Sequence, residues 1–152
     1  MSVSLQVLTA DDWRIWRDLR LAALRTDPQA FSSTVADWAD ADEARWRGRL
    51  SLPGGRDLVA RLDGVPVGMA TGLLAASEVS LLSMWVAPSA RGHGVGDALM
   101  RAVADWARTR GADTLTLDVV EGNAAAVALY KRHGLVDVGP AGAGERRMRL
   151  DL

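Results

Sequence analysis

The sequence predicts one α/β domain in which short strands and amphipathic helices alternate. Two observations carry this prediction. An apolar run from Val79 to Ala87 leads through a glycine-rich turn into an amphipathic helix, and a strand with period-two alternation, Thr114 to Val119, leads into a helix that begins at Asn123. The 152 residues, 49% of them hydrophobic, suffice for one core. We therefore expect a single domain over residues 1–152.

The composition excludes several classes of function. A formal net charge of −1 argues against a nucleic-acid partner, and no apolar stretch approaches the roughly 18 residues of a membrane span. The absence of cysteine excludes disulfides, thiolate metal sites and a cysteine nucleophile. Nothing in the sequence predicts a metal site. The N-terminus lacks a basic region followed by an apolar segment, so a cytoplasmic protein is expected.

The N-terminal third of the chain predicts one strand and two helices. Weak alternation indicates a strand at Val3 to Leu8, and the pair Thr9 and Asp12 has the spacing of a capping box for the first helix, which Pro28 ends. A second short helix is expected near residues 40–52. The first helix carries a basic stripe, which is typical of a solvated face: Arg14, Arg17, Arg20 and Arg25.

Five further strands are expected, besides the one at Thr114. Asp63 and Gly64 form a hairpin turn signal between the first two of them. Residues 139–144, rich in glycine, are expected to form a loop between the last two. The strands are Asp57 to Leu62, Val65 to about Leu74, one beginning at Glu78, one around Val136, and Arg146 to Leu150.

The glycine-rich turn has the features of a phosphate-binding site. The helix after it has Val95, Leu99, Ala102 and Trp106 on its apolar face, and Gly111 stands where a C-terminal glycine cap belongs. The first turn of a helix leaves its N–H groups unpaired, and residues without Cβ atoms let a bulky anion approach them. We therefore expect a phosphate or pyrophosphate to bind here.

The spacing distinguishes this turn from two common phosphate-binding loops. A dinucleotide-binding G-x-G-x-x-G pattern that starts at Gly92 would need its third glycine at Asp97. A P-loop needs Gly-Lys-Ser/Thr, but the single lysine of the chain is Lys131. Neither pattern fits.

The remaining pattern, Arg91-x-x-Gly94-x-Gly96 after a strand, resembles the acyl-CoA pyrophosphate loop of the GNAT superfamily of N-acetyltransferases. The run from Leu117 to Leu135, in which Asn123, Ala126 and Tyr130 share one helical stripe, is similar to the second cofactor-binding segment of that superfamily. The resemblance covers residues 79–138 closely. It implies the GNAT fold, an α/β (α+β) architecture with a mixed, mostly antiparallel central sheet of about seven strands flanked by about four helices.

The resemblance also implies a function. It implies an acetyl-CoA-dependent N-acetyltransferase that transfers an acetyl group directly to a primary amine of a small molecule or a protein. A non-catalytic acyl-CoA-binding sensor module is the alternative. The sequence identifies neither the acceptor nor the acyl chain, and it leaves a homodimer open.

By the same resemblance, roles can be assigned to individual residues. The Val86 N–H would polarise the acetyl carbonyl, and Tyr130 would protonate the leaving thiolate unless it is only a core tyrosine. Asn123 would contact the pantetheine arm and is also a good helix cap. The full set of expected cofactor-binding residues is Met84, Val86, Arg91, Gly92, His93, Gly94, Val95, Gly96, Asn123 and Tyr130.

The general base is less well defined. Many relatives have a glutamate where this chain has Ser80. Glu78 lies two residues earlier, on the same face of a regular strand, and is the carboxylate we favour as a catalytic residue. The alternatives are Asp118, Glu121, or a water held by Ser80 or Ser83.

Residues 36–46 border the acceptor channel if the family resemblance holds. They contain four carboxylates and two tryptophans, a combination that suits a positively charged amine. The competing interpretation is that the carboxylates cap helices and the tryptophans belong to the core.

Overall fold

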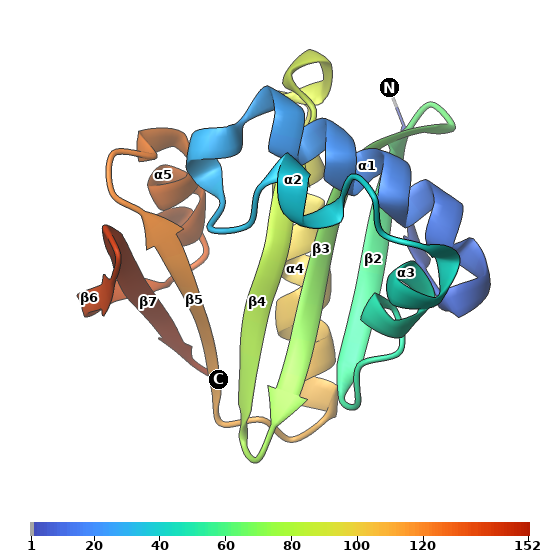
Figure 1. Ribbon diagram of the computed structural model, residues 1–152. Coiled ribbons are helices and arrows are strands. Elements are labelled where there is room, and N and C mark those ends of the chain that lie inside the picture. Colours follow the sequence, from blue (N-terminus) through green and yellow to red (C-terminus); the bar gives the residue numbers. More distant parts are fainter. Residues whose placement is uncertain (1) are drawn as a thin grey trace.

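The computed structural model describes residues 2–152, which form a mixed sheet of seven strands with α-helices on both faces (Figure 1). The strand order is β1-β2-β3-β4-β5-β7-β6. In chain order the elements are β1 (Val3–Val7), α1 (Trp13–Thr26), α2 (Val35–Trp38), α3 (Glu43–Arg49), β2 (Gly55–Leu62), β3 (Val65–Ala75), β4 (Glu78–Val86), α4 (Val95–Thr109), β5 (Thr114–Val120), α5 (Ala124–Arg132), β6 (Val136–Gly142) and β7 (Glu145–Asp151).

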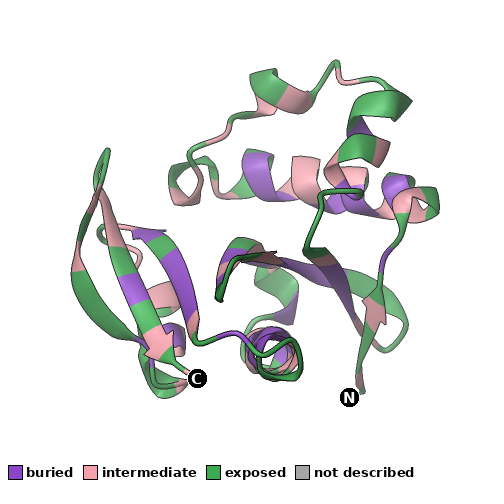
Figure 2. Ribbon diagram, turned by 90° about the horizontal axis from the view of Figure 1, so that it is seen from below, coloured by how far each residue is buried: buried purple, intermediate pink, exposed green. Residues whose placement is uncertain are grey.

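The helices form two layers around this sheet. Helices α1, α2 and α3 cover one face, and α4 packs on the other (Figures 1 and 2). Every neighbouring pair of strands is antiparallel except β4 and β5, which are parallel. The architecture expected from the sequence is therefore confirmed, with the short helix α2 as an addition. Within the described chain no helix is long and apolar enough to cross a bilayer.

The parallel pair β4 and β5 separates soon after it begins. The two strands pair only where residues 78–80 of β4 face residues 114–116 of β5, and beyond that point they diverge (Figure 1). A register shift where β3 faces β4, beside Ala70, accompanies the left-handed backbone of Ser83, whose φ is 53°. Such a bulge bends a strand and turns its peptide groups. The divergence opens a gap in the middle of the sheet.

The core lies on both sides of the sheet. Helix α4 buries Val95, Leu99, Met100 and Val103 against the strands, whereas Ala102 and Trp106 are only half-buried at the edge of this face. The apolar face expected from the sequence is thus rotated toward Met100 and Val103. On the other face, a second cluster packs α1 and α3 onto β2, β3 and β4 (Figure 2).

The structure confirms a capping box, a hairpin turn and a helix C-terminus that the sequence predicted from neighbouring residues. Thr9 and Asp12 form a capping box, in which the Thr9 N–H donates to Asp12 Oδ2 at 2.8 Å. Asp63 and Gly64 have φ of 50° and 85°, as a tight two-residue hairpin requires. Gly111 follows α4 with φ of 73°, the left-handed conformation of a helix C-terminus.

Two expectations about irregular segments are wrong. Residues 139–144 do not form a loop, because β6 continues to Gly142 and turns into β7 at Ala143 and Gly144, with φ of 47° and 75°. Pro140 is tolerated in this strand because β6 is the edge of the sheet and its pairing with β7 is irregular on both sides of Pro140. The second helix is also shorter than expected, since α3 spans only Glu43–Arg49.

Candidate active site

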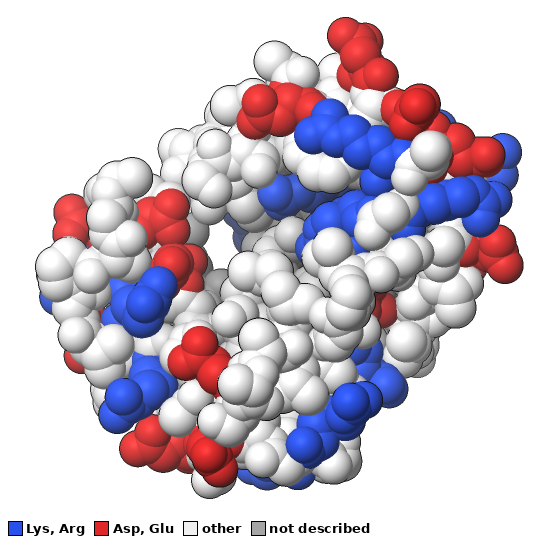
Figure 3. Space-filling model, turned by 60° about the horizontal axis from the view of Figure 1, so that its bottom comes forward, with Lys and Arg blue, Asp and Glu red and all other residues white. Residues whose placement is uncertain are grey.

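Two cavities meet at the gap between β4 and β5. One, of about 550 Å³, lies beneath α1, α2 and α3, and the other, of about 570 Å³, extends toward Arg91 and residues 120–126. The surface is visibly hollowed between its two halves (Figure 3). Because several residues line both cavities, one extended ligand can occupy both. The shared residues are Ala30, Phe31, Met84, Asn123, Ala126 and Tyr130.

The Val86 peptide group faces this gap. Ala87 N donates to the Val67 carbonyl at 2.7 Å. Hydrogen bonds alternate along an antiparallel pair, so the preceding residue, Val86, turns its N–H and C=O away from β3. The Val86 carbonyl indeed accepts a hydrogen bond from Arg91 Nε at 3.0 Å on that side. The Val86 N–H is therefore directed into the gap.

Arg91 and Asp27 connect the loop after β4 to α1. Asp27, the residue that follows α1, accepts hydrogen bonds from Trp85 Nε1 at 2.8 Å and from Arg91 Nη2 at 2.7 Å. The Trp85 hydrogen bond, followed by those of Arg91, lowers the pKa of Asp27 below its usual value. The Arg91 side chain therefore holds the backbone at the mouth of the gap. Sequence analysis did not identify Asp27, because its partners lie about 60 residues away.

The glycine loop is open on the side where an anion would bind. Gly92 and Gly94 have φ of 83° and 79°, and a Cβ built on either would meet no atom within 4 Å. Gly94 is the N-cap of α4, so the first N–H groups of the helix lack intrahelical partners. The residues present thus fit a phosphate group.

The other loop residues contribute in different ways. The Val95 side chain is buried in the core, so only its backbone can contact a ligand, while His93 is exposed. Gly96 allows close packing, since an added Cβ would lie 3.2 Å from Leu129. Of the ten expected cofactor-binding residues, those at positions 92–96 line neither cavity, whereas Arg91 lines the second.

Asn123 and Tyr130 lie as the helical stripe predicts. Asn123 caps α5, with its Oδ1 accepting from Ala126 N at 3.3 Å, and it lines both cavities. Tyr130 is only 6% exposed, and burial raises its pKa above the usual value near 10. Among residues 2–152 the Tyr130 hydroxyl has no hydrogen-bond partner, although the residue lines both cavities. Its hydroxyl group is thus available to a ligand.

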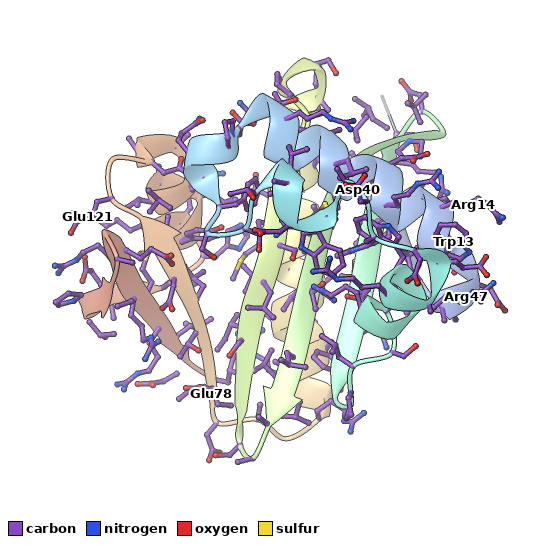
Figure 4. All side chains as sticks on the ribbon, viewed as in Figure 1. Trp13, Arg14, Asp40, Arg47, Glu78 and Glu121 are labelled. Carbon is purple, nitrogen blue, oxygen red and sulfur yellow. The ribbon has the colours of Figure 1, made fainter. Side chains whose placement is uncertain are left out.

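Glu78 lines the first cavity but lies at the closed end of the gap. It is the first residue of β4, near the lower end of the sheet in Figure 4. Val86 lies eight positions further along this extended strand, a span of roughly 25 Å at about 3.3 Å per residue. The structure therefore does not bring Glu78 next to Val86 and Tyr130.

The alternative bases have different surroundings. Asp118 lines the first cavity and is held by Arg147, at 2.9 Å from Nε and 3.2 Å from Nη2. Glu121 lines the second cavity and points outward beyond β5 in Figure 4. Ser80 and Ser83 both line the first cavity, and the Ser83 hydroxyl accepts a hydrogen bond at 3.2 Å from Arg49, discussed below.

The carboxylates of residues 36–46 do not line either cavity, so the acidic wall expected there is absent from the described site. Asp37 completes the capping box of α2, accepting from Thr34 N at 2.8 Å, and Asp42 caps α3 through Arg45 N at 2.9 Å. Asp40 is exposed beyond α2 (Figure 4). The capping interpretation is correct for Asp37 and Asp42, because their oxygens satisfy N–H groups of nearby helix termini.

Three arginines line the first cavity: Arg20 and Arg49 from the helical layer, and Arg147, the partner of Asp118, from β7. Arg49 donates to Asp57 Oδ1 and Thr71 Oγ1, each at 3.0 Å, as well as to Ser83. Arg20 belongs to the arginine stripe of α1, for which the sequence predicted a solvated face. The prediction is wrong for Arg20, which lines the cavity. The chain offered no local signal for Arg20 or Arg49, because their roles depend on how α1 and α3 dock onto the sheet.

No group of three metal-ligating side chains occurs within the described chain. The anion-binding glycine loop, the gap and the two cavities suit an organic ligand with a phosphate group at one end and a second molecule beyond it.

Comparisons with known proteins agree with this geometry. A mycothiol acetyltransferase of Clavibacter sepedonicus is 33% identical over 135 residues, which are 89% of this chain and 43% of that protein. A streptothricin acetyltransferase of Streptomyces lavendulae is 50% identical over 54 residues, 36% of this chain and 29% of that protein. The chain spans less than half the length of both relatives.

The fold is shared with solved structures as well. The structure of a PaiA N-acetyltransferase from Thermoplasma acidophilum, in complex with coenzyme A, aligns with a TM-score of 0.83 over 100% of both chains at 16% identity. The model of the acetyltransferase (GNAT) family matches residues 13–135. Since this match takes in the open gap, the glycine loop and Tyr130 together, the chain belongs to the acetyltransferase (GNAT) family.

Proposed function

We propose that this protein is an acetyl-CoA-dependent N-acetyltransferase that acetylates a primary amine directly. One observation carries the proposal: two cavities meet at the gap between β4 and β5, with Tyr130 lining both of them and Val86 lining the second. A thioester reaching the junction from one cavity would meet an amine arriving from the other.

The second cavity and the glycine loop fit the cofactor. The N–H groups of the first turn of α4 can bind pyrophosphate oxygens, and Gly92 and Gly94 leave the space for them open. Asn123 lines the route from the loop to the junction. The coenzyme A complex of the Thermoplasma acidophilum protein, which has the same fold, supports this assignment.

Acetyl-CoA supplies an acetyl thioester, whose carbonyl carbon an amine can attack. The Val86 N–H donates a hydrogen bond to the carbonyl oxygen as negative charge develops there, an effect worth about 3 kcal/mol. A C–N bond forms and the C–S bond breaks with its electron pair on sulfur. Tyr130 gives its hydroxyl proton to that sulfur, and the amine loses one proton to a base.

Glu78 remains our proposal for the base. It lines the cavity through which the amine would enter. The span along β4 means that the proton would pass through water, with Ser80 as a nearby hydroxyl on the same wall. A proton relay through water accelerates the reaction less than a base in direct contact with the amine does.

The alternative, a non-catalytic acyl-CoA sensor, would need the loop and the second cavity only. Tyr130 argues against it, because a sensor has no need of a proton donor beside both cavities, and a phenylalanine would fill the same space.

Release of free thiol from acetyl-CoA, measured with a panel of amines, tests the proposal. We expect turnover with at least one class of primary amine. Tyr130→Phe keeps the ring and removes the proton, so kcat should fall roughly 100-fold while the Kd for acetyl-CoA changes little. Equal kcat in the two proteins would make Tyr130 structural. Binding of acetyl-CoA without turnover of any amine would favour the sensor.

A further inference from the structure

Arg20 is a partly buried arginine that lines the first cavity. Its Nη1 atom is buried, and within residues 2–152 it has no hydrogen-bond partner. Its Cζ lies 4.8 Å from the centre of the Phe31 ring, so the guanidinium is held against an aromatic face. No carboxylate of the described chain forms an ion pair with it. Withdrawing part of a charged group from water without a counter-ion costs free energy and calls for an explanation.

The neighbouring Arg49 does not share this property. Arg49 lies 3.0 Å from Asp57, which is 4% exposed, and Thr71 donates to the same carboxylate oxygen at 2.6 Å. The charges of Arg49 and Asp57 therefore balance. Burial, and next the nearby charge of Arg49, lower the pKa of Arg20 to about 10, so Arg20 still carries a full charge at neutral pH. The α1 side of the cavity has one uncompensated positive charge.

The position of Arg20 relates it to the acceptor. Phe31 lines both cavities, and Arg20, which lines the first, packs on the Phe31 ring. Basic atoms border the hollow on the side of the helices in Figure 3. Glu78 and Glu145 line the same cavity from β4 and β7, across the gap from α1. The cavity is thus positive on one wall and negative on the other.

We propose that Arg20 binds a carboxylate of the acceptor, and that the acceptor is a small molecule carrying an amine and a carboxylate a few bonds apart, as in an amino acid. This inference rests on the proposed function. The planar guanidinium matches a carboxylate with two parallel hydrogen bonds. A single carboxylate charge balances the single uncompensated arginine, whereas a phosphate near charge −2 would leave excess charge in the cavity.

The proposal reverses the charge expected for the acceptor from the sequence. The carboxylates of residues 36–46 cap helices or face solvent, and the tryptophans of that segment, Trp38 and Trp46, pack together at 4.8 Å. Both tryptophans line the cavity, which makes its α2 and α3 side aromatic rather than acidic. Arg20 is therefore the charged group on that side that is free to recognise a ligand within the described chain.

Matched acceptors separate the carboxylate from the amine. Amino acids and their carboxamides should be compared in the thiol-release assay with the wild type, Arg20→Gln, Arg20→Lys and the control Arg14→Gln. Arg14 lies on the same helix but is exposed and points outward (Figure 4). We expect kcat/KM for the preferred amino acid to exceed that for its amide, and to fall roughly 10- to 100-fold in Arg20→Gln.

Three further results are expected from these variants. Activity with the amide should change less than about threefold in Arg20→Gln, because no charged hydrogen bond is lost there. Arg20→Lys should keep part of the preference for the amino acid over its amide, since the positive charge remains but the paired N–H donors of the guanidinium are lost. The KM for acetyl-CoA should be the same in all four proteins. Equal loss with both acceptors would show that Arg20 only supports the structure, and would overturn the proposal.

The same experiment distinguishes failure of this inference from failure of the proposed function. If amides or cationic amines are acetylated as well as amino acids by the wild type, transferase activity stands and the inference fails. If only phosphorylated amines depend on Arg20, the carboxylate assignment is wrong. Calorimetric titration with the amino acids requires no turnover: binding that Arg20→Gln abolishes supports the inference even without transfer, and no binding to the wild type refutes it.

Discussion

Replacement of Gly94 by alanine tests the anion-binding loop with a matched control in the same helix. Gly94 is the N-cap of α4, with φ 79° and ψ 10°, and Gly111 follows the other end of α4 with φ 73°. A Cβ at either position would have no atom within 4 Å. Alanine therefore clashes with nothing at either site, and its cost is the left-handed conformation, about 1 to 2 kcal/mol for an L-residue. The two variants should lose similar stability, a Tm decrease of roughly 2 to 8 °C.

Only the Gly94 variant should lose affinity for acetyl-CoA. Its methyl group would project into the space above the N–H groups of the first turn of α4, where phosphate oxygens need to approach closely. We expect at least a tenfold increase in Kd, about 1.4 kcal/mol. Gly111→Ala should bind with the affinity of the wild type, because that end of the helix presents carbonyl groups.

Isothermal titration calorimetry gives both Kd values, and chemical denaturation gives both stabilities. A Gly94→Ala protein that loses stability as Gly111→Ala does, yet binds acetyl-CoA as tightly as the wild type, would refute the assignment of this loop to the cofactor. An equal loss of affinity in both variants would attribute the effect to the strained helix and not to the anion.

The remaining predictions concern Glu78 and Tyr130. Glu78→Gln should flatten the acidic limb of the pH–rate profile and lower kcat by less than about tenfold, because a proton relayed through water depends less on one carboxylate than direct transfer does; a profile identical to that of the wild type would remove Glu78 from the mechanism. Burial raises the pKa of Tyr130 in the folded state above the value near 10 of the unfolded chain. The stability that the neutral hydroxyl contributes is therefore fully present below pH 10 and is lost as the pH rises further. The loss is at most about 1.4 kcal/mol per pH unit. Denaturation of the wild type and Tyr130→Phe between pH 9 and about 11.5 should show this decrease in the wild type alone; parallel pH dependences would mean that the tyrosine is accessible to water.

Features that depend on residues close together in the chain were predictable. The Thr9 and Asp12 capping box, the Asp63-Gly64 turn and the Asn123 cap each require contacts between residues at most three positions apart. Helical geometry likewise places Asn123 and Tyr130 on one stripe, since the spacing of seven residues is two turns. Side-chain alternation predicted β5, whose Leu115, Leu117 and Val119 are buried.

The charge of the acceptor cavity was decided by tertiary structure. Arg20 and the solvated arginines of α1 have the same helical spacing, and only the docking of α1 over Phe31 and the gap separates them. Asp27 joins α1 to Trp85 and Arg91 across roughly 60 residues, and Asp57 balances Arg49 from another strand. The sequence analysis placed the carboxylates of residues 36–46 in the acceptor channel, and this is wrong. Asp37 and Asp42 cap the helix termini of α2 and α3 and are thereby held outside the cavity.

The sequence by itself determined the strand order along the chain, the glycine loop and the position of Tyr130, because backbone conformation and periodicity are properties of neighbouring residues. The tertiary structure decided which ionisable side chains meet in the cavity and which have their charge compensated. Electrostatic energy depends on distance and burial, and both are set only when helices and strands pack together.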